Sequence, residues 1–132
     1  MTRRATCVCG QLQISCEGEP VRVSVCYCTG CQKRTGSAFG AQARFAVEHV
    51  KVEGRAASYE RAADSGNRIT FSFCPACGST VFWENLGIPD FTTVALGAFA
   101  DPEFPEPTVT VYEVRRPRWL PALDGPGVEH MD

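Results

Sequence analysis

Three cysteines within six residues constrain this chain more than any other feature. Residues 26–31 read Cys-Tyr-Cys-Thr-Gly-Cys, which places Cys26, Cys28 and Cys31 in the pattern Cys-x-Cys-x-x-Cys. Deprotonated thiols bind zinc, and the Cys-x-x-Cys spacing lets two sulfurs point at one ion, with Gly30 expected to form the turn between them. A structural zinc takes four protein ligands, whereas three ligands and an open position are typical of a zinc that takes part in chemistry.

Composition narrows the class of protein. The chain has 132 residues, of which 44% are hydrophobic and 21% charged, and this predicts a single globular domain over residues 1–132. A net charge of −2 argues against a nucleic-acid partner, and the lack of an apolar run of about 18 residues argues against a membrane span. Residues 1–7 lack the apolar core of a secretory signal, so we expect a cytoplasmic protein. Eight cysteines in that reducing compartment favour metal binding over disulfides.

Short segments of alternating hydrophobicity, separated by turn residues, predict an all-β domain of several antiparallel sheets. The expected strands are residues 12–16, 21–25, 38–45, 47–52, 68–73, 80–84, 92–99 and 108–114. Residues 32–37 are expected to form a loop with room for one helical turn, and the pattern of residues 56–61 is ambiguous. Residues 115–132 contain three prolines and predict an extended tail, packed on the domain through Trp119 and Leu120.

Two further cysteine pairs suggest how the thiols divide. Cys7 and Cys9 lie in a turn near the N-terminus, and Cys74 and Cys77 form a knuckle between two expected strands. Joined, the pairs would make a closed, tetrahedral four-thiolate site that stabilises the fold by closing a long loop. Residues 26–31 would then remain as an open three-thiolate site.

Cys16 offers a different partition. It falls on the apolar face of the expected strand at residues 12–16, which favours a small buried side chain. If Cys16 instead completed the site at residues 26–31, both metal sites would be structural. His49 lies in a strand-like run and His130 in the tail, and we expect both at the surface rather than on a metal.

An open three-thiolate zinc site suits sulfur chemistry. It would bind an incoming thiol and lower the pKa of that thiol, and a thiolate can attack a small aldehyde to form a carbon–sulfur bond. Lys33, Arg34 and Ser37 follow the cluster and are candidates to bind the carboxylates of a peptide thiol. Tyr27 is the only titratable candidate within the cluster for moving a proton, and its ordinary pKa is high for a general base.

The cysteine motifs and several flanking segments form one pattern along nearly the whole chain. The segments are Cys7-x-Cys9-Gly10, Cys26-x-Cys28-x-x-Cys31, Arg34-x-Gly36-Ser37-Ala38-Phe39, Phe73-Cys74-x-x-Cys77-Gly78-Ser79, Gly97-x-Phe99-x-Asp101-Pro102 and Trp119-Leu120. This pattern resembles the glutathione-dependent formaldehyde-activating enzyme family. The resemblance implies several coiled antiparallel β-sheets, a structural zinc on the first and third cysteine motifs, and a catalytic zinc on the second.

The resemblance also implies a reaction. Members of the family are named for condensing formaldehyde with glutathione to S-hydroxymethylglutathione, which is a carbon–sulfur lyase activity in reverse. This chain has Tyr27 where many members have histidine, and it is shorter than the glutathione-using members. Because the family also includes members with no assigned enzyme activity, the alternative function is a zinc-stabilised interaction module without catalysis.

Overall fold

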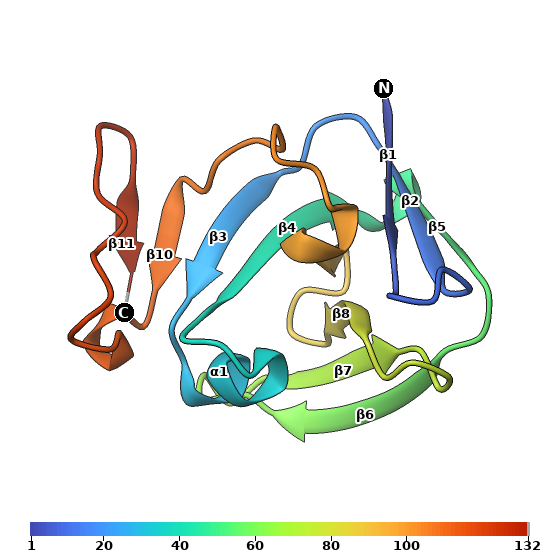
Figure 1. The fold of residues 1–132 in the computed structure, drawn as a ribbon, viewed down its shortest axis with the longest axis horizontal. Coiled ribbons are helices and arrows are strands. Elements are labelled where there is room, and N and C mark those ends of the chain that lie inside the picture. Colours follow the sequence, from blue (N-terminus) through green and yellow to red (C-terminus); the bar gives the residue numbers. More distant parts are fainter. Residues whose placement is uncertain (132) are drawn as a thin grey trace.

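The computed structural model describes residues 1–131 and arranges them in two β-sheets with one short α-helix (Figure 1). The all-β class expected from the sequence is confirmed. The strands are β1 (Thr2–Thr6), β2 (Gln13–Glu17), β3 (Arg22–Cys26), β4 (Gly40–Ala46), β5 (Val50–Glu53), β6 (Ala57–Ala62), β7 (Arg68–Phe73), β8 (Thr80–Asn85), β9 (Phe91–Ala95), β10 (Val109–Val111) and β11 (Glu129–Met131). The helices are α1 (Thr29–Thr35) and the 3₁₀ helices η1 (Val47–His49), η2 (Leu96–Phe99) and η3 (Glu113–Arg115).

The small sheet joins the N-terminus to the middle of the chain. β1 pairs with β2, and β2 pairs with β5, both in antiparallel register. Ala5 lies opposite Ile14, and both side chains are fully buried, which fixes the register of this sheet against the core. The strand β1 is absent from the sequence expectation, because its polar residues do not alternate clearly with apolar ones.

The large sheet contains eight strands in the order β11-β10-β3-β4-β9-β8-β7-β6, and it curves around the domain (Figure 1). The pairings from β3 to β6 are antiparallel, as expected. β10 differs, since it pairs in parallel with both β3 and β11. The irregular residues 101–107 carry the chain back so that β10 enters beside β3 in the same direction.

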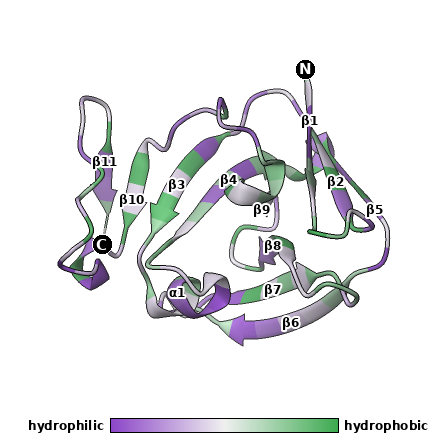
Figure 2. Ribbon diagram, in the orientation of Figure 1, coloured by the Kyte–Doolittle hydropathy of each residue, from purple (hydrophilic) through white to green (hydrophobic). Residues whose placement is uncertain are grey.

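The core lies between the two sheets and the 3₁₀ helix η2. Phe45, Leu12 and Ile14 are among its largest fully buried side chains, and Phe45 packs against Phe99 of η2 with ring centroids 6.2 Å apart. Figure 2 shows apolar residues on β7 and β10, whereas the edge strands β6 and β11 are mainly hydrophilic. Polar side chains on edge strands are unfavourable for pairing with another chain.

The expected strand–knuckle–strand hairpin is present. β7 and β8 pair in antiparallel register, with a register shift at Ser72 and Phe73 immediately before the knuckle. The Cys74 amide donates to the Ser79 carbonyl, and the Gly78 amide donates to the Cys74 carbonyl. Gly78 has a φ of 81°, in the left-handed region that glycine adopts without strain.

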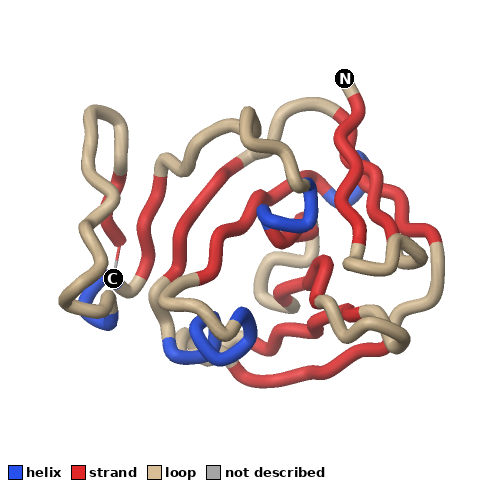
Figure 3. Tube along the Cα trace, viewed as in Figure 1, coloured by secondary structure: helices blue, strands red, loops and turns tan. Residues whose placement is uncertain are grey.

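Three expected strands are shorter than predicted (Figure 3). The segments 47–52 and 92–99 contain the 3₁₀ helices η1 and η2, and the segment 108–114 ends in the first two residues of η3. Apolar alternation continues through these turns, so hydrophobicity alone does not separate them from strands. No helix within residues 1–131 has the length and apolar character needed to cross a membrane.

The helix α1 corrects the role expected for Gly30, which lies inside the helix rather than in a tight turn. Cys28 is the N-cap, and its sulfur accepts a hydrogen bond from the Cys31 amide at 3.3 Å. Gly36 ends the helix with a φ of 67°, and its amide donates to the Gln32 carbonyl. A capped helix of two turns therefore replaces the expected loop.

The C-terminal segment is held differently from the expectation. Trp119 is 75% exposed, so the prediction that it packs the tail onto the domain is wrong, while Leu120 is half-buried. The segment is fixed instead by backbone pairing, since β11 adds to β10 and the Glu129 amide donates to the Thr108 carbonyl. Backbone bonds satisfy this proline-containing stretch without a large apolar anchor.

Candidate metal centres

Four cysteines from two distant parts of the chain meet at one end of the small sheet. Cys7 and Cys9 lie in the turn between β1 and β2, and Cys74 and Cys77 lie in the turn between β7 and β8. Their four sulfur atoms all lie within 4.8 Å of one another. The structure therefore brings together the two pairs that the sequence analysis joined.

The spacing of these sulfurs fits a tetrahedral ion. Zinc–sulfur bonds of about 2.3 Å require sulfur atoms about 3.8 Å apart. The Cys7 and Cys9 sulfurs are 3.6 Å apart, and the Cys9 and Cys74 sulfurs are 3.7 Å apart. At Cys77, hydrogen bonding from Ser79 lowers the pKa of the thiol to about 5, which favours the thiolate that a metal requires.

Nitrogen donors point at the sulfurs of this four-cysteine cluster. Gln11 Nε2 donates to Cys74 Sγ at 3.0 Å, and the Ala76 amide donates to the same sulfur at 3.3 Å. The Leu12 amide donates to Cys7 Sγ at 3.3 Å. Because hydrogen bonds to the charged form favour it, these donors stabilise thiolates, as in a metal-bound cluster.

The second cluster comes from a single segment of the chain. Cys26 ends β3, Cys28 caps α1, and Cys31 lies in the first turn of that helix. Their sulfurs also lie within 4.8 Å of one another, and the three residues are only 6–8% exposed. Among the described residues, this group contains three thiols and no fourth ligand.

Nearby cations compensate negative charge in this three-cysteine cluster. Hydrogen bonds from Cys26 and Cys31 lower the pKa of the Cys28 thiol to about 2, and the Arg61 guanidinium lowers it further. The pKa of the Cys31 thiol is raised overall, mainly because Cys28 and burial outweigh the hydrogen bond from Cys26, and the charge of Arg34 opposes this rise. Three thiols, of which Cys28 favours the thiolate, beside two guanidinium groups form a donor set that suits zinc.

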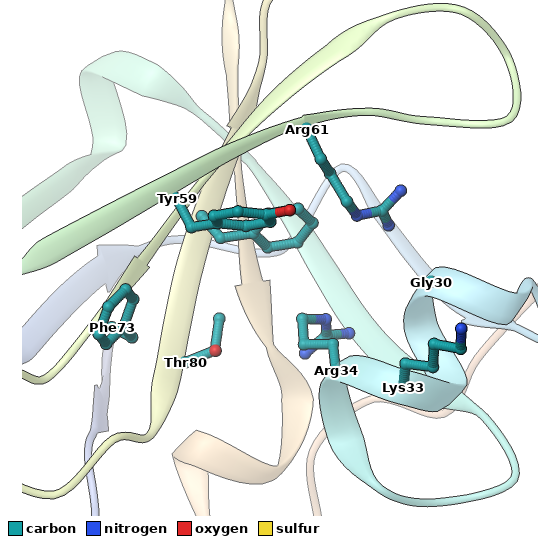
Figure 4. Close-up of a pocket in the computed structure, with 8 residues that line it drawn as sticks. Gly30, Lys33, Arg34, Tyr59, Arg61, Phe73 and Thr80 are labelled. Atoms are coloured by element: carbon teal, nitrogen blue, oxygen red, sulfur yellow. The ribbon is translucent and has the colours of Figure 1, made fainter.

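A cavity of about 390 Å³, drawn in Figure 4, has Gly30 in its lining, and Gly30 lies between Cys28 and Cys31 in the sequence. Helix α1 contributes Lys33 and Arg34, β6 contributes Arg61, and three aromatic rings form much of the remaining wall. The full lining is Gly30, Lys33, Arg34, Tyr59, Arg61, Phe71, Phe73 and Thr80. Three positive charges without a lining carboxylate make the cavity suited to an anion.

The two arginines are oriented by aromatic rings. The Arg34 guanidinium lies 4.2 Å from the centroid of Trp83, and that of Arg61 lies 5.1 Å from the centroid of Phe71. Arg34 Nε and Nη2 are buried and have no hydrogen-bond partner within residues 1–131. Donors held in place but unpaired are costly unless a ligand accepts from them.

Two glycines let these arginines approach the cluster. A Cβ on Gly30 would overlap the Arg61 guanidinium, and a Cβ on Gly40 would crowd both Arg34 and Cys31. Gly40 also pairs with Cys26 across β3 and β4. The glycine expected to make a turn thus serves instead to admit a cation to the site.

The expected site residues separate into those inside and outside this site. Lys33 and Arg34 line the cavity, whereas Ser37 is exposed beyond the end of α1 and is not part of the lining. Cys16 lies in the core, away from both clusters, and burial raises the pKa of its thiol to about 12. The geometry therefore opposes the partition in which Cys16 completes the second cluster.

The sequence analysis missed Arg61 and Tyr59, which face the cavity from β6. Both stand on one face of the strand because they are two residues apart. Reading residues 56–61 as a strand would have placed them together, but the chain gave no signal that this face lies opposite α1.

Fold and clusters together define a class of small β-proteins with one four-cysteine and one three-cysteine cluster, each of which could hold a metal ion. The chain belongs to the glutathione-dependent formaldehyde-activating enzyme family, whose model matches residues 2–115. A crystal structure of a Rhodobacter sphaeroides protein, determined as a structural genomics target, has a similar fold. Its TM-score is 0.57 at 20% sequence identity, covering 72% of this chain and 85% of that chain. A search of curated proteins finds no match.

Proposed function

We propose that this protein is a zinc-dependent carbon–sulfur lyase that joins a thiol and a small aldehyde, or separates their adduct, as in S-hydroxymethylglutathione synthesis. The observation that carries this proposal is a three-cysteine cluster beside a cavity with three cationic side chains. We assign a structural zinc to Cys7, Cys9, Cys74 and Cys77 and a catalytic zinc to Cys26, Cys28 and Cys31. We place the protein in the cytoplasm, where such thiols stay reduced.

The proposed reaction is an addition. Zinc held by three thiolates would supply an open position that binds a thiol and lowers its pKa. The substrate sulfur attacks the aldehyde carbon, a carbon–sulfur bond forms, and the carbonyl oxygen takes up the proton that the thiol has lost. In the reverse direction the same bond breaks and returns thiol and aldehyde. The main task of the protein is to hold the two reactants in contact.

The cavity residues would hold the thiol. Lys33, Arg34 and Arg61 present ammonium and guanidinium groups that bind carboxylates, and the family name points to glutathione, which has two carboxylates. The charge of Arg34, which lines the cavity, would attract one of them. Ser37 would contact only a ligand that extends beyond the cavity, along the end of α1.

The test compares thiols with and without carboxylates. Zinc-loaded protein should combine formaldehyde with glutathione, and Arg61→Gln should raise KM for glutathione about tenfold by removing a charge-assisted hydrogen bond. KM for cysteamine, which has no carboxylate, should not change. Lys51→Gln is the control, because Lys51 is exposed on β5 in the other sheet. If Arg61→Gln changed KM for glutathione and for cysteamine equally, the cavity would have no role in binding the carboxylates of the thiol.

A second candidate function is a zinc-stabilised interaction module without catalysis. The low exposure of the three thiols, 6–8%, favours it, because a closed metal site only supports the fold. Cobalt-substituted protein separates the two functions, since thiolate–cobalt absorption changes when a substrate sulfur joins the cluster. An unchanged spectrum with every thiol, together with no turnover, would favour the module.

A further inference from the structure

Tyr112 stands out at the edge of the three-cysteine cluster. Its φ is 58° and its ψ is 42°, in the left-handed region. Within residues 1–131, only Ala100 shares a positive φ among residues other than glycine. A bulky residue in this conformation is strained, and such residues gather at functional sites.

The unusual backbone determines where the ring goes. Successive side chains of a strand point to opposite faces, so Val111 and Tyr112 should face opposite sides of the sheet. Instead both pack against the cluster of Cys26, Cys28 and Cys31. The left-handed conformation at the end of β10 turns the Tyr112 ring back onto the sulfurs.

Three parts of the chain hold the ring in that position. The Tyr112 amide donates to the Met131 carbonyl of β11 at 2.9 Å. The Arg115 guanidinium lies 5.5 Å from the ring centroid and forms an ion pair with Asp64, in the turn that follows β6. Gln32 of α1 donates to the Arg115 carbonyl at 3.2 Å. One side of the cluster is thus bordered by residues 112–115, which contact β11, Asp64 and Gln32.

We propose that Tyr112 is the specificity-determining residue of the three-cysteine site. Its ring walls off the side next to β10, so that a ligand sulfur reaches the cluster only from the side of Gly30 and Arg61, where the cavity begins. This leaves room for a primary thiol, with its sulfur on a CH₂ group, and excludes a thiol whose sulfur-bearing carbon is fully substituted. The proposal rests on the proposed function insofar as the ligand is a thiol.

The first experiment uses cobalt-loaded protein and two closely matched thiols. Cysteine has a primary thiol, and penicillamine differs from it by two methyl groups on the carbon that bears sulfur. Wild type should respond to cysteine at a concentration at least about tenfold lower than to penicillamine, since a pocket rejects extra methyl groups by that order. Tyr112→Asn should respond to both, because asparagine tolerates a left-handed backbone but lacks the ring. Tyr112→Phe should keep the discrimination, since it keeps the ring.

The second experiment does not depend on thiol binding. Zinc-loaded protein is alkylated with iodoacetamide and with the bulkier N-ethylmaleimide, and each cysteine is followed by peptide mass spectrometry. Tyr112→Asn should speed alkylation at residues 26–31, more for the bulkier reagent, while the four-cysteine cluster stays as in wild type. Val114→Ala is the control, because Val114 is 82% exposed in the same segment.

The outcomes separate the two proposals. Equal responses of wild type to cysteine and penicillamine, or continued exclusion of penicillamine by Tyr112→Asn, would overturn the role of Tyr112. If no thiol changes the wild-type spectrum, the proposed reaction fails, and alkylation then decides about Tyr112 alone. Faster alkylation in Tyr112→Asn, but not in Val114→Ala, would support the claim that the Tyr112 ring shields the cluster. Unchanged alkylation rates in Tyr112→Asn would refute that claim.

Discussion

The two cysteine clusters differ in how the chain builds them. The four-cysteine cluster joins two distant turns, in which the neighbouring sulfurs of Cys9 and Cys74 come from residues 65 positions apart. Cys9 is exposed. The three-cysteine cluster comes from six consecutive residues, and all its thiols are buried. One cluster thus connects distant segments at the surface, whereas the other is local in sequence yet covered by distant segments.

Their neighbours differ as well. Amides of the backbone and of Gln11 donate to the sulfurs of the four-cysteine cluster. The three-cysteine cluster is bordered instead by Arg34, Arg61 and the strained Tyr112. Amide donors hold sulfur ligands in place, whereas cationic side chains that line a cavity can receive a ligand. This difference supports the proposed division, in which the four-cysteine cluster stabilises the fold and the three-cysteine cluster carries out the chemistry.

The largest expected effect is loss of the fold when the four-cysteine cluster is broken. Cys74→Ser should give an unfolded or insoluble chain, because structural zinc in small domains contributes on the order of 10 kcal/mol to folding. Cys28→Ser should stay folded and bind one zinc less. Circular dichroism and metal analysis of both variants make the comparison, and equal thermal stability of Cys74→Ser and wild type would refute the structural assignment.

The next effect is the order of metal loss. Because a three-thiolate site provides fewer ligands, a mild chelator should remove its zinc first and leave the strands intact. Native mass spectrometry would count the ions while circular dichroism follows the fold. Unfolding in step with the first ion lost would contradict the division of roles between the clusters.

A smaller effect is expected at Gln11. Its Nε2 donates to Cys74 Sγ and to the Arg55 carbonyl, and its Oε1 accepts from the Arg55 amide. Gln11→Ala should lower the free energy of unfolding by about 2 kcal/mol, because it leaves these groups unpaired. Gln13→Ala is the matched control, since Gln13 donates one bond, to the Gly10 carbonyl. Denaturant unfolding measures both, and equal losses would argue against support of the sulfur by Gln11.

The smallest effect on stability is expected at Asp64. Asp64→Asn removes the exposed ion pair with Arg115 and should cost under about 1 kcal/mol. It should nevertheless speed alkylation of the three-cysteine cluster, because Arg115 contacts the Tyr112 ring. Glu60→Gln removes a comparably exposed pair with Arg68 in the same hairpin and should leave alkylation unchanged. Equal alkylation rates in the two variants would show that the ion pair does not hold the ring.

The clusters were predictable because cysteine spacing is local information. A Cys-x-x-Cys motif brings its two sulfurs together through the turn or helix that contains it, whatever the rest of the chain does. The pairing of Cys7 and Cys9 with Cys74 and Cys77 followed from ligand number. The apolar alternation at Cys16 likewise agreed with its place in the core.

The surroundings of the three-cysteine cluster were not predictable in the same way. Tyr112 reaches the cluster because β10 lies beside β3 in parallel, and Arg61 reaches it because β6 ends opposite α1. Both positions depend on the order of strands in the sheet, which hydrophobic alternation does not specify. The left-handed backbone at Tyr112 could not be predicted either, because the usual sequence signal for that conformation is glycine and this position is a tyrosine.

The separation between Cys9 and Cys74 also determines the order in which the two clusters can be completed while the chain is being synthesised. A ribosome adds about 5–20 residues per second, so the first pair of thiols waits roughly 3–13 s for its partners. The segment 26–31 is complete within that interval. The nascent chain therefore completes the three-cysteine segment first, and the four-cysteine cluster is the last to have all its thiols synthesised.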